Sequence, residues 1–268
     1  MPKFLFWNLN QRGIPDLIAR VAWEELVDVL ILAECGSSPA RMLEALNAER
    51  TEYDFGFSSC PRLRVFTRFD AGMMPPLWES ERITIRRLTL PGRHAVLVAG
   101  VHLPSKVNVS EESQVFESIH LARAIDEVEK QEKHRRTLVM GDLNMNPFEA
   151  GVVGARGGLH AVASREVAQR FVRTVQRENY RFFYNPMWSH LGDRNDAGGT
   201  YYYDGGEAVC YFWNMYDQVL LRPALTFRFA PEHVRILTEA GGVPLLAQGR
   251  PDRSVGSDHL PVVVELEF

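Results

Sequence analysis

The stretch VMGDLNMNP at residues 139–147 decides the fold, because an apolar run passes there directly into a turn of polar residues. Residues 137–140 have the pattern of a buried strand, and Gly141 begins the turn. Ligands of α/β folds bind at the carboxyl ends of such strands. Side chains alternate along an extended chain, so Asp142 and Asn144 are expected on the same side. The alternative is a turn without further role, because Asp and Asn form turns readily.

Polar residues with catalytic chemistry recur at the ends of other apolar stretches. They are Asn8, Glu34, His102, Asp142 with Asn144, and Asp258 with His259. Asp217 is an acid within the otherwise apolar strand of residues 213–221. Each residue has an ordinary explanation by itself, such as a turn or a satisfied buried histidine. Together, these six coincidences predict one polar site that several strands build in common.

Composition is consistent with a single domain over residues 1–268, since 46% of the residues are hydrophobic and no Ser-, Gly- or Pro-rich linker divides them. The N-terminal residues lack a signal-peptide pattern, and no apolar run approaches a membrane-spanning length. The three cysteines form no Cys-x-x-Cys pair, which favours a reducing, cytoplasmic location. We therefore expect no membrane association, and nothing in the sequence indicates a protein partner.

Charge gives a weaker indication of the partner. The formal net charge is −4, so no global basic field points to nucleic acid.

Helical spacing of apolar residues predicts helices beginning near Gly13, after Ser110 as N-cap, and over residues 164–177. Five arginines accompany the last of these: Arg165, Arg170, Arg173, Arg177 and Arg181. A solvated helix face is the favoured interpretation, and a contact surface for phosphates is the alternative.

The predicted site is strongly acidic, because it holds three aspartates and one glutamate. Carboxylates do not crowd a partly dry site unless a cation or protons offset their charge. Oxygen ligands without cysteine select Mg²⁺ or Mn²⁺ over Zn²⁺. A divalent ion beside two histidines and carboxamide donors fits the hydrolysis of a phosphate ester.

These residues resemble the successive motifs of a known superfamily. The motifs are Trp7-Asn8-x-Asn10, a strand ending in Glu34, Val101-His102-Leu103, Gly141-Asp142-Leu143-Asn144-x-x-Pro147, Tyr216-Asp217-Gln218-Val219 and Ser257-Asp258-His259-Leu260-Pro261-Val262. In this order they resemble the endonuclease/exonuclease/phosphatase superfamily from residue 3 to the C-terminus. The resemblance implies a DNase I-like α/β fold, a two-sheet β-sandwich flanked by helices, with the site at one end.

The resemblance also implies roles for individual residues. Glu34 would be the principal Mg²⁺ ligand, with Asn8 near the metal and the phosphate and Asn10 in substrate binding. His259 would be a general base oriented by Asp217, or alternatively a phosphate contact.

Three further roles complete the implied site. Asp142 would orient or deprotonate the attacking water. Asn144 and His102 would stabilise charge on the phosphoryl oxygens. Asp258 would support His259 or a second metal position.

Two positions depart from common family patterns. Tyr216-Asp217-Gln218 stands where Ile-Asp-Tyr or Leu-Asp-Tyr is frequent, and His102 stands where abasic-site endonucleases of the family usually have Tyr. His at that position is more similar to the DNase-I-like, sphingomyelinase-like and phosphatase branches.

Three hypotheses remain at this point. The first is a Mg²⁺-dependent phosphodiesterase, an endonuclease or exonuclease whose partner is DNA or RNA. The second is a phosphatase or phosphodiesterase acting on a small-molecule or lipid-headgroup phosphate, which the acidic net charge favours. The third is an inactive binding module, and the intact set of site residues argues against it.

Overall fold

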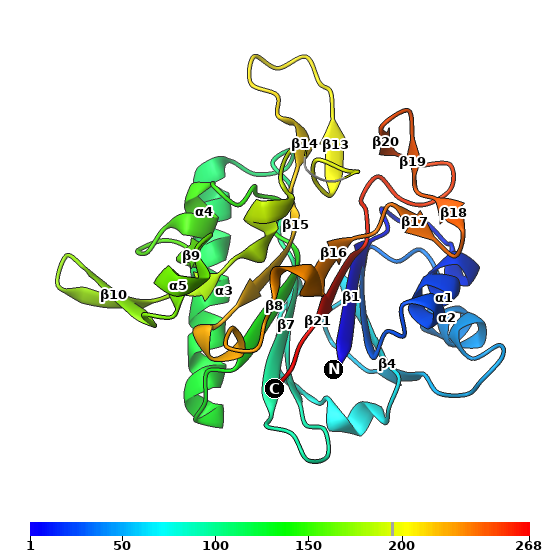
Figure 1. The fold of residues 1–268 in the computed structure, drawn as a ribbon, viewed down its shortest axis with the longest axis horizontal. Coiled ribbons are helices and arrows are strands. Elements are labelled where there is room, and N and C mark those ends of the chain that lie inside the picture. The colour runs from blue at the N-terminus through cyan, green and yellow to red at the C-terminus, as the bar shows by residue number, and fades with distance from the viewer. Residues whose placement is uncertain (194–195) are drawn as a thin grey trace.

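Two large mixed sheets form the framework in the computed structural model, which describes residues 1–193 and 196–268 (Figure 1). The first sheet has the order β16-β21-β1-β2-β4-β3. Its strands are β1 (Lys3–Asn8), β2 (Val29–Ala33), β3 (Asp54–Gly56), β4 (Leu63–Thr67), β16 (Val234–Ile236) and β21 (Val262–Glu265). The second sheet has the order β5-β6-β7-β8-β15-β12-β9. Its strands are β5 (Pro76–Glu79), β6 (Ile83–Leu88), β7 (Val96–His102), β8 (Thr137–Asp142), β9 (Ala161–Val162), β12 (Phe183–Tyr184) and β15 (Asp217–Leu221).

The sheets pack face to face, and helices cover their outer faces. Phe4, Phe6 and Ile31 of the first sheet share one buried cluster with Met140 and Val219 of the second. The alternate side chains of the same strands are buried too, under α1 (Pro15–Glu24) and α2 (Pro39–Leu46) on one side and under α3 (Glu111–Glu132) on the other (Figure 1). Burial on both faces explains why the central strands are apolar throughout.

Strand directions bring the predicted site residues to one end of the sandwich. β1 runs parallel to β2, with Asn8 opposite Ala33, and β7 runs parallel to β8, with His102 opposite Asp142. β15 is antiparallel to β8 and begins with Asp217 opposite Asp142. β21 is likewise antiparallel to β1 and begins just after the Asp258–His259 pair. Strand ends of one direction and strand starts of the other therefore meet at the same edge.

Several predicted helix boundaries agree with the structure. α1 has Pro15 in its first turn, where the missing N–H of proline costs nothing. The Ser110 hydroxyl caps α3 by accepting the Ser113 N–H at 3.3 Å, and the helix ends at Lys133 in the left-handed conformation. No helix among the described residues is long and apolar enough to cross a membrane.

The helix predicted over residues 164–177 is wrong. α5 (Arg165–Ala168) makes a single turn, and β10 (Val172–Val175) and β11 (Glu178–Arg181) then form a separate antiparallel hairpin. Phe171, Gln176 and Arg177 have φ of 66°, 50° and 70°, which end the helix and form the turn. β-Branched residues in β10 also favour a strand. The hairpin projects from the body of the molecule (Figure 1).

Shorter elements complete the fold. A second hairpin, β13 (Tyr201–Tyr203) and β14 (Phe212–Asn214), rises above the site end (Figure 1). The remaining elements are α4 (Ala150–Val153), β17 (Glu239–Ala240), β18 (Val243–Pro244), β19 (Leu246–Ala247), β20 (Arg250–Pro251) and the 3₁₀ turns η1 (Ala71–Met73), η2 (Pro186–His190), η3 (Pro223–Leu225) and η4 (Pro231–His233).

Candidate active site

Eight of the nine predicted site residues line one cavity of about 900 Å³ at the end of the sandwich. They are Asn8, Asn10, Glu34, His102, Asp142, Asn144, Asp258 and His259. The ninth, Asp217, lies directly behind His259 and is fully buried. Six separate segments of the chain thus supply one site, as the strand-end pattern predicted.

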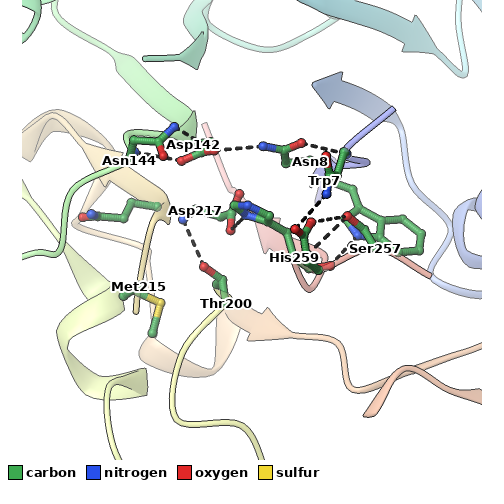
Figure 2. Close-up of polar contacts among 12 residues, drawn as sticks. Trp7, Asn8, Asp142, Asn144, Thr200, Met215, Asp217, Ser257 and His259 are labelled. Carbon is green, nitrogen blue, oxygen red and sulfur yellow. Dashed lines mark hydrogen bonds and ion pairs between the residues drawn. The ribbon is translucent and has the colours of Figure 1, made fainter. Parts of the chain in front are cut away.

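Asp217 holds the ring of His259. The Asp217 Oδ2 and the His259 Nδ1 are 2.8 Å apart, and the Asp217 backbone N–H donates to the Thr200 hydroxyl at 3.1 Å (Figure 2). The Trp7 indole fixes the backbone on the other side by donating to the His259 carbonyl at 2.8 Å. With Nδ1 occupied, Nε2 is the ring nitrogen left for the cavity.

The electrostatics of this pair extend to Asp142. Burial by itself lowers the pKa of His259, but the charge and hydrogen bond of Asp217 outweigh it and raise the pKa to about 9. Burial, together with the charge of Asp217, raises the pKa of Asp142 to about 7. Ligand atoms of Asp142, Asp217 and His259 all lie within 4.8 Å of one another. The protonation of His259 is therefore tied to its two buried carboxylate neighbours.

Amide donors surround Asp142. Its Oδ2 accepts from the side chains of Asn8 at 2.9 Å and Asn144 at 3.1 Å, and its Oδ1 accepts the Asn144 backbone N–H at 2.8 Å (Figure 2). Asn144 has a φ of 51°, so the turn itself brings the two side chains together. The stretch therefore forms the predicted turn and also places both side chains at the cavity. Gly141 is needed before the turn, because a Cβ there would lie 2.0 Å from the Val101 carbonyl oxygen.

Glu34 and His102 lie side by side in the cavity wall, next to Asp142. The Glu34 Oε1 is 3.3 Å from His102 Nε2, and the Gln11 amide donates to Oε2 at 3.4 Å. Burial, and next the positive charges of Arg82 and Arg62, lower the pKa of His102 to about 3. The imidazole is thus neutral. The Glu34 side chain is 23% exposed and lines the cavity.

The backbone of this wall is strained. Asn10, Gln11 and Glu34 have φ of 43°, 61° and 47°, in the left-handed region that residues other than glycine rarely occupy. Such conformations cost about 1–3 kcal/mol each and persist where surrounding structure holds them. Here they aim the Glu34 carboxylate into the cavity rather than along the strand.

Asp258 has partners other than the expected His259. Its Oδ2 accepts from the Asn10 amide at 2.8 Å and pairs with Arg253 at 3.2 Å, while Ser257 donates to Oδ1 at 3.2 Å. Among the described residues no hydrogen bond joins Asp258 to the imidazole of His259. Asp258 therefore links Asn10 to the rim, and the hydrogen bond to the His259 ring comes from Asp217.

The donor set fits a divalent ion. The predicted site residues combine carboxylate and carboxamide oxygens with imidazole nitrogen, and none of them carries sulfur. The Asp217 Oδ1 is buried and has no hydrogen-bond partner among the described residues, so negative charge here is incompletely offset. The tightest candidate group is Asp142, Asp217 and His259, which differs from the predicted ligands Glu34, Asn8 and Asp258. Asp217 and His259 already bond to each other, whereas Glu34 faces the cavity.

Aromatic residues of the β13–β14 region were missed from the sequence. The Tyr201 ring lies 4.7 Å from that of His259 and 5.4 Å from that of Tyr216. Exposed apolar side chains continue the cavity wall outward: Val107, Phe148, Val209 and Tyr211. The run Tyr201-Tyr202-Tyr203 was the available signal, but its position beside His259 depends on long-range pairing.

The sequence matches the Endonuclease/Exonuclease/phosphatase family over residues 5–259. The chain belongs to this family. Membership confirms the resemblance stated above and makes the protein a hydrolytic phosphoesterase. The family generally depends on divalent metal ions, and this chain contains a candidate cluster of acidic and histidine residues. A comparison with curated protein sequences found no match.

Solved structures share the fold across the whole chain. Humanized D. rerio TDP2 is 18% identical with a TM-score of 0.56, covering 100% of this chain and 99% of that one. An endonuclease/exonuclease/phosphatase family protein from Bacteroides thetaiotaomicron is 12% identical with a TM-score of 0.58, covering 99% and 94%. The 3′ phosphatase NExo from Neisseria, bound to product DNA hairpin, is 15% identical with a TM-score of 0.53, covering 100% of both chains. These likenesses confirm the DNase I-like sandwich.

Proposed function

We propose that this protein is a Mg²⁺-dependent phosphodiesterase that hydrolyses DNA or RNA. The observation that carries the proposal is the Asp217–His259 pair facing a cavity that Glu34, Asp142 and Asn144 also line. Two structures with the same fold support a nucleic-acid substrate. D. rerio TDP2 has been solved with single strand DNA product, and the Neisseria 3′ phosphatase with product DNA hairpin.

Glu34 would hold the metal ion, with Asn8 and Asp258 nearby. Its carboxyl group is held by His102 and Gln11 and is open to the cavity. A Mg²⁺ or Mn²⁺ ion there supplies positive charge for the phosphoryl oxygens. Phosphoryl transfer needs positioning and charge neutralisation more than covalent chemistry, which suits this set of residues.

The remaining residues bind the phosphate and the attacking water. Carboxylates on two sides stabilise the charged imidazole of His259, so its Nε2–H would donate to a phosphoryl oxygen. Asp142, held by Asn8 and Asn144, would orient the water and accept its proton. His102, beside Glu34, would present a neutral N–H to the phosphate.

A second candidate is a phosphodiesterase or phosphatase for a small-molecule or lipid-headgroup phosphate. The apolar rim favours it, because Val107, Val209 and Tyr211 are 92%, 70% and 53% exposed beside the cavity. Such a rim would accept an acyl chain or another apolar substituent as well as an unstacked base.

A substrate panel separates these candidates. We would incubate the protein with single-stranded DNA, single-stranded RNA, duplex DNA, p-nitrophenyl phosphate and phospholipid vesicles, each in Mg²⁺ and in EDTA. Rapid cleavage of oligonucleotides supports the proposal, while cleavage of only phosphomonoesters or lipids supports the second candidate. Glu34→Gln should remove activity, and Glu52→Gln, at an exposed position outside the cavity, is the matched control. No hydrolysis of any substrate by the wild type would indicate a binding module.

A further inference from the structure

The segment of residues 165–181, which forms a short helix and a hairpin rather than one long helix, is rich in positive charge. Residues 165–181, here called the arginine arm, contain five arginines and two glutamates, a local charge of +3 within a chain of net charge −4. The arm comprises α5, β10 and β11 and projects from the body of the molecule (Figure 1). An isolated two-stranded hairpin adds little to a core, so its charge pattern calls for another explanation.

Three arginines of the arm are free to bind a ligand. Arg170, Arg173 and Arg177 are exposed, and none forms an ion pair with a carboxylate among the described residues. The two other arginines serve the fold. Arg181 pairs with Asp126 at 3.8 Å, and Arg165 donates to the Phe229 carbonyl.

Apolar groups accompany these charges. Phe171 is 46% exposed, Val172 is 41% exposed and Phe227 is 65% exposed, with the rings of Phe171 and Phe227 6.3 Å apart. A surface that only kept the protein soluble would not need exposed rings. Arginines interleaved with exposed aromatic rings are typical of surfaces that bind single-stranded nucleic acid.

Residues 150–156 connect the catalytic cavity to the arm. Ala150 and Gly151 of α4 line the cavity. Exposed Arg156 follows five residues later, and its guanidinium donates to the Gln176 side chain at the arm's turn at 3.4 Å. Five residues span at most about 18 Å of backbone. At about 3.4 Å for each nucleotide of a helical strand, that distance corresponds to roughly five nucleotides.

We propose that the arginine arm is a second contact site for the phosphate backbone of the nucleic-acid substrate, which leaves the catalytic cavity over α4. This inference rests on the proposed function and identifies the preferred substrate as a polynucleotide rather than a dinucleotide. Arg156 and Arg177 would meet the backbone first, and Arg170 and Arg173 would extend the contact. Each neutralised phosphate releases counterions, so the contact gains affinity mainly at low salt.

The test compares two triple variants on two substrate lengths. The arm variant is Arg170→Ala/Arg173→Ala/Arg177→Ala. The control variant is Arg41→Ala/Arg228→Ala/Arg250→Ala, which removes three ion-paired arginines from other surfaces. The arm variant should raise KM about tenfold or more for a 20-nucleotide strand at low salt, while kcat and all kinetics on a dinucleotide stay unchanged. The control variant should match the wild type.

Binding provides a readout that needs no hydrolysis. Fluorescence anisotropy with a labelled 20-mer in EDTA should show weaker binding by the arm variant, and a slope of log K against log salt smaller by about 2, from three lost contacts at about 0.7 each. The role of the arm would be overturned if the arm variant lost the same fraction of kcat/KM on the dinucleotide and on the 20-nucleotide strand. It would also be overturned if both triple variants bound the 20-mer equally well. If the wild type binds the 20-mer through the arm but cleaves nothing, the proposed function fails and the contact site stands. Circular dichroism of each variant excludes misfolding as the cause.

Discussion

The two ends of strands β8 and β15 carry buried polar clusters of opposite character. At the site end, Asp142 stands opposite Asp217. At the far end, Arg222 follows β15 and donates to Glu129 at 2.8 Å, and Thr137 of β8 donates to the same carboxylate oxygen at 2.7 Å. The guanidinium of Arg222 also lies 4.0 Å from the centre of the Phe183 ring. The same two strands therefore present two clusters for direct comparison.

The far-end cluster balances its charges, and the site-end cluster does not. Glu129 is 3% exposed and Arg222 is 4% exposed, and each offsets the charge of the other. At the site end, burial and the charge of Asp217 raise the pKa of Asp142, and Glu34 adds a third carboxyl group to the cavity. A buried cluster with balanced charges needs no further ligand. A cluster with excess negative charge can instead bind a cation, which in turn attracts the phosphate group of a substrate.

The largest expected effect concerns catalysis at the site end. His259→Asn should lower kcat by about 10²–10⁴-fold, because a positioned proton donor or acceptor contributes that much. Its melting temperature should stay close to that of the wild type. His94→Asn, at an exposed turn, is the matched control and should keep full activity. Near-normal turnover by His259→Asn, measured under saturating substrate, would remove His259 from the mechanism.

At the far end, we expect a substitution to lower stability and leave catalysis unchanged. Arg222→Met leaves Glu129 buried without its ion-pair partner and should lower the free energy of unfolding by about 3–5 kcal/mol. Urea denaturation measures this loss, and the folded fraction should retain its kcat. The double variant Arg222→Met/Glu129→Leu should recover part of the loss, because both charges are then absent. A single variant as stable as the wild type would show that the cluster contributes nothing to stability.

The smallest expected effect is a gain in stability from Asp142→Asn in the metal-free protein. Folding raises the pKa of Asp142 to about 7, so its ionised form opposes folding above the unfolded pKa. Wild-type stability relative to the variant should therefore fall as pH rises from about 4 to 7. At pH 8 in EDTA, the variant should be about 1 kcal/mol more stable and much less active. If Asp142→Asn were less stable than the wild type at pH 8, the site end would not carry excess negative charge.

Much of the site could be predicted because its signals are local. Glu34, His102 and Asp142 each follow a strand whose apolar run is visible in the sequence, and parallel neighbours bring such ends together. The sandwich and the position of its site end followed from the family resemblance, which the family match confirms.

The remaining features depend on contacts that no local pattern records. Val167, Phe171 and Val175 have helical spacing, yet left-handed φ at Phe171 ends that helix after one turn. Arg222 and Glu129 are 93 residues apart in the chain, and their pairing follows from the packing of α3 on β15. The bonds of Asp258 to Asn10 and Arg253 arise likewise from the meeting of two loops.

The most direct test of the metal-dependent centre is the rate of oligonucleotide hydrolysis as a function of Mg²⁺ concentration, for the wild type and Glu34→Gln. We expect a saturable rise in the wild-type rate and complete loss in EDTA. Glu34→Gln should need at least a tenfold higher half-saturating Mg²⁺ concentration or show no activity, because even an outer-shell partner of a metal ligand typically contributes about 10–100-fold and a direct ligand should contribute no less. Hydrolysis that persists in EDTA and is unchanged in Glu34→Gln would contradict a metal-dependent site at this end of the sandwich.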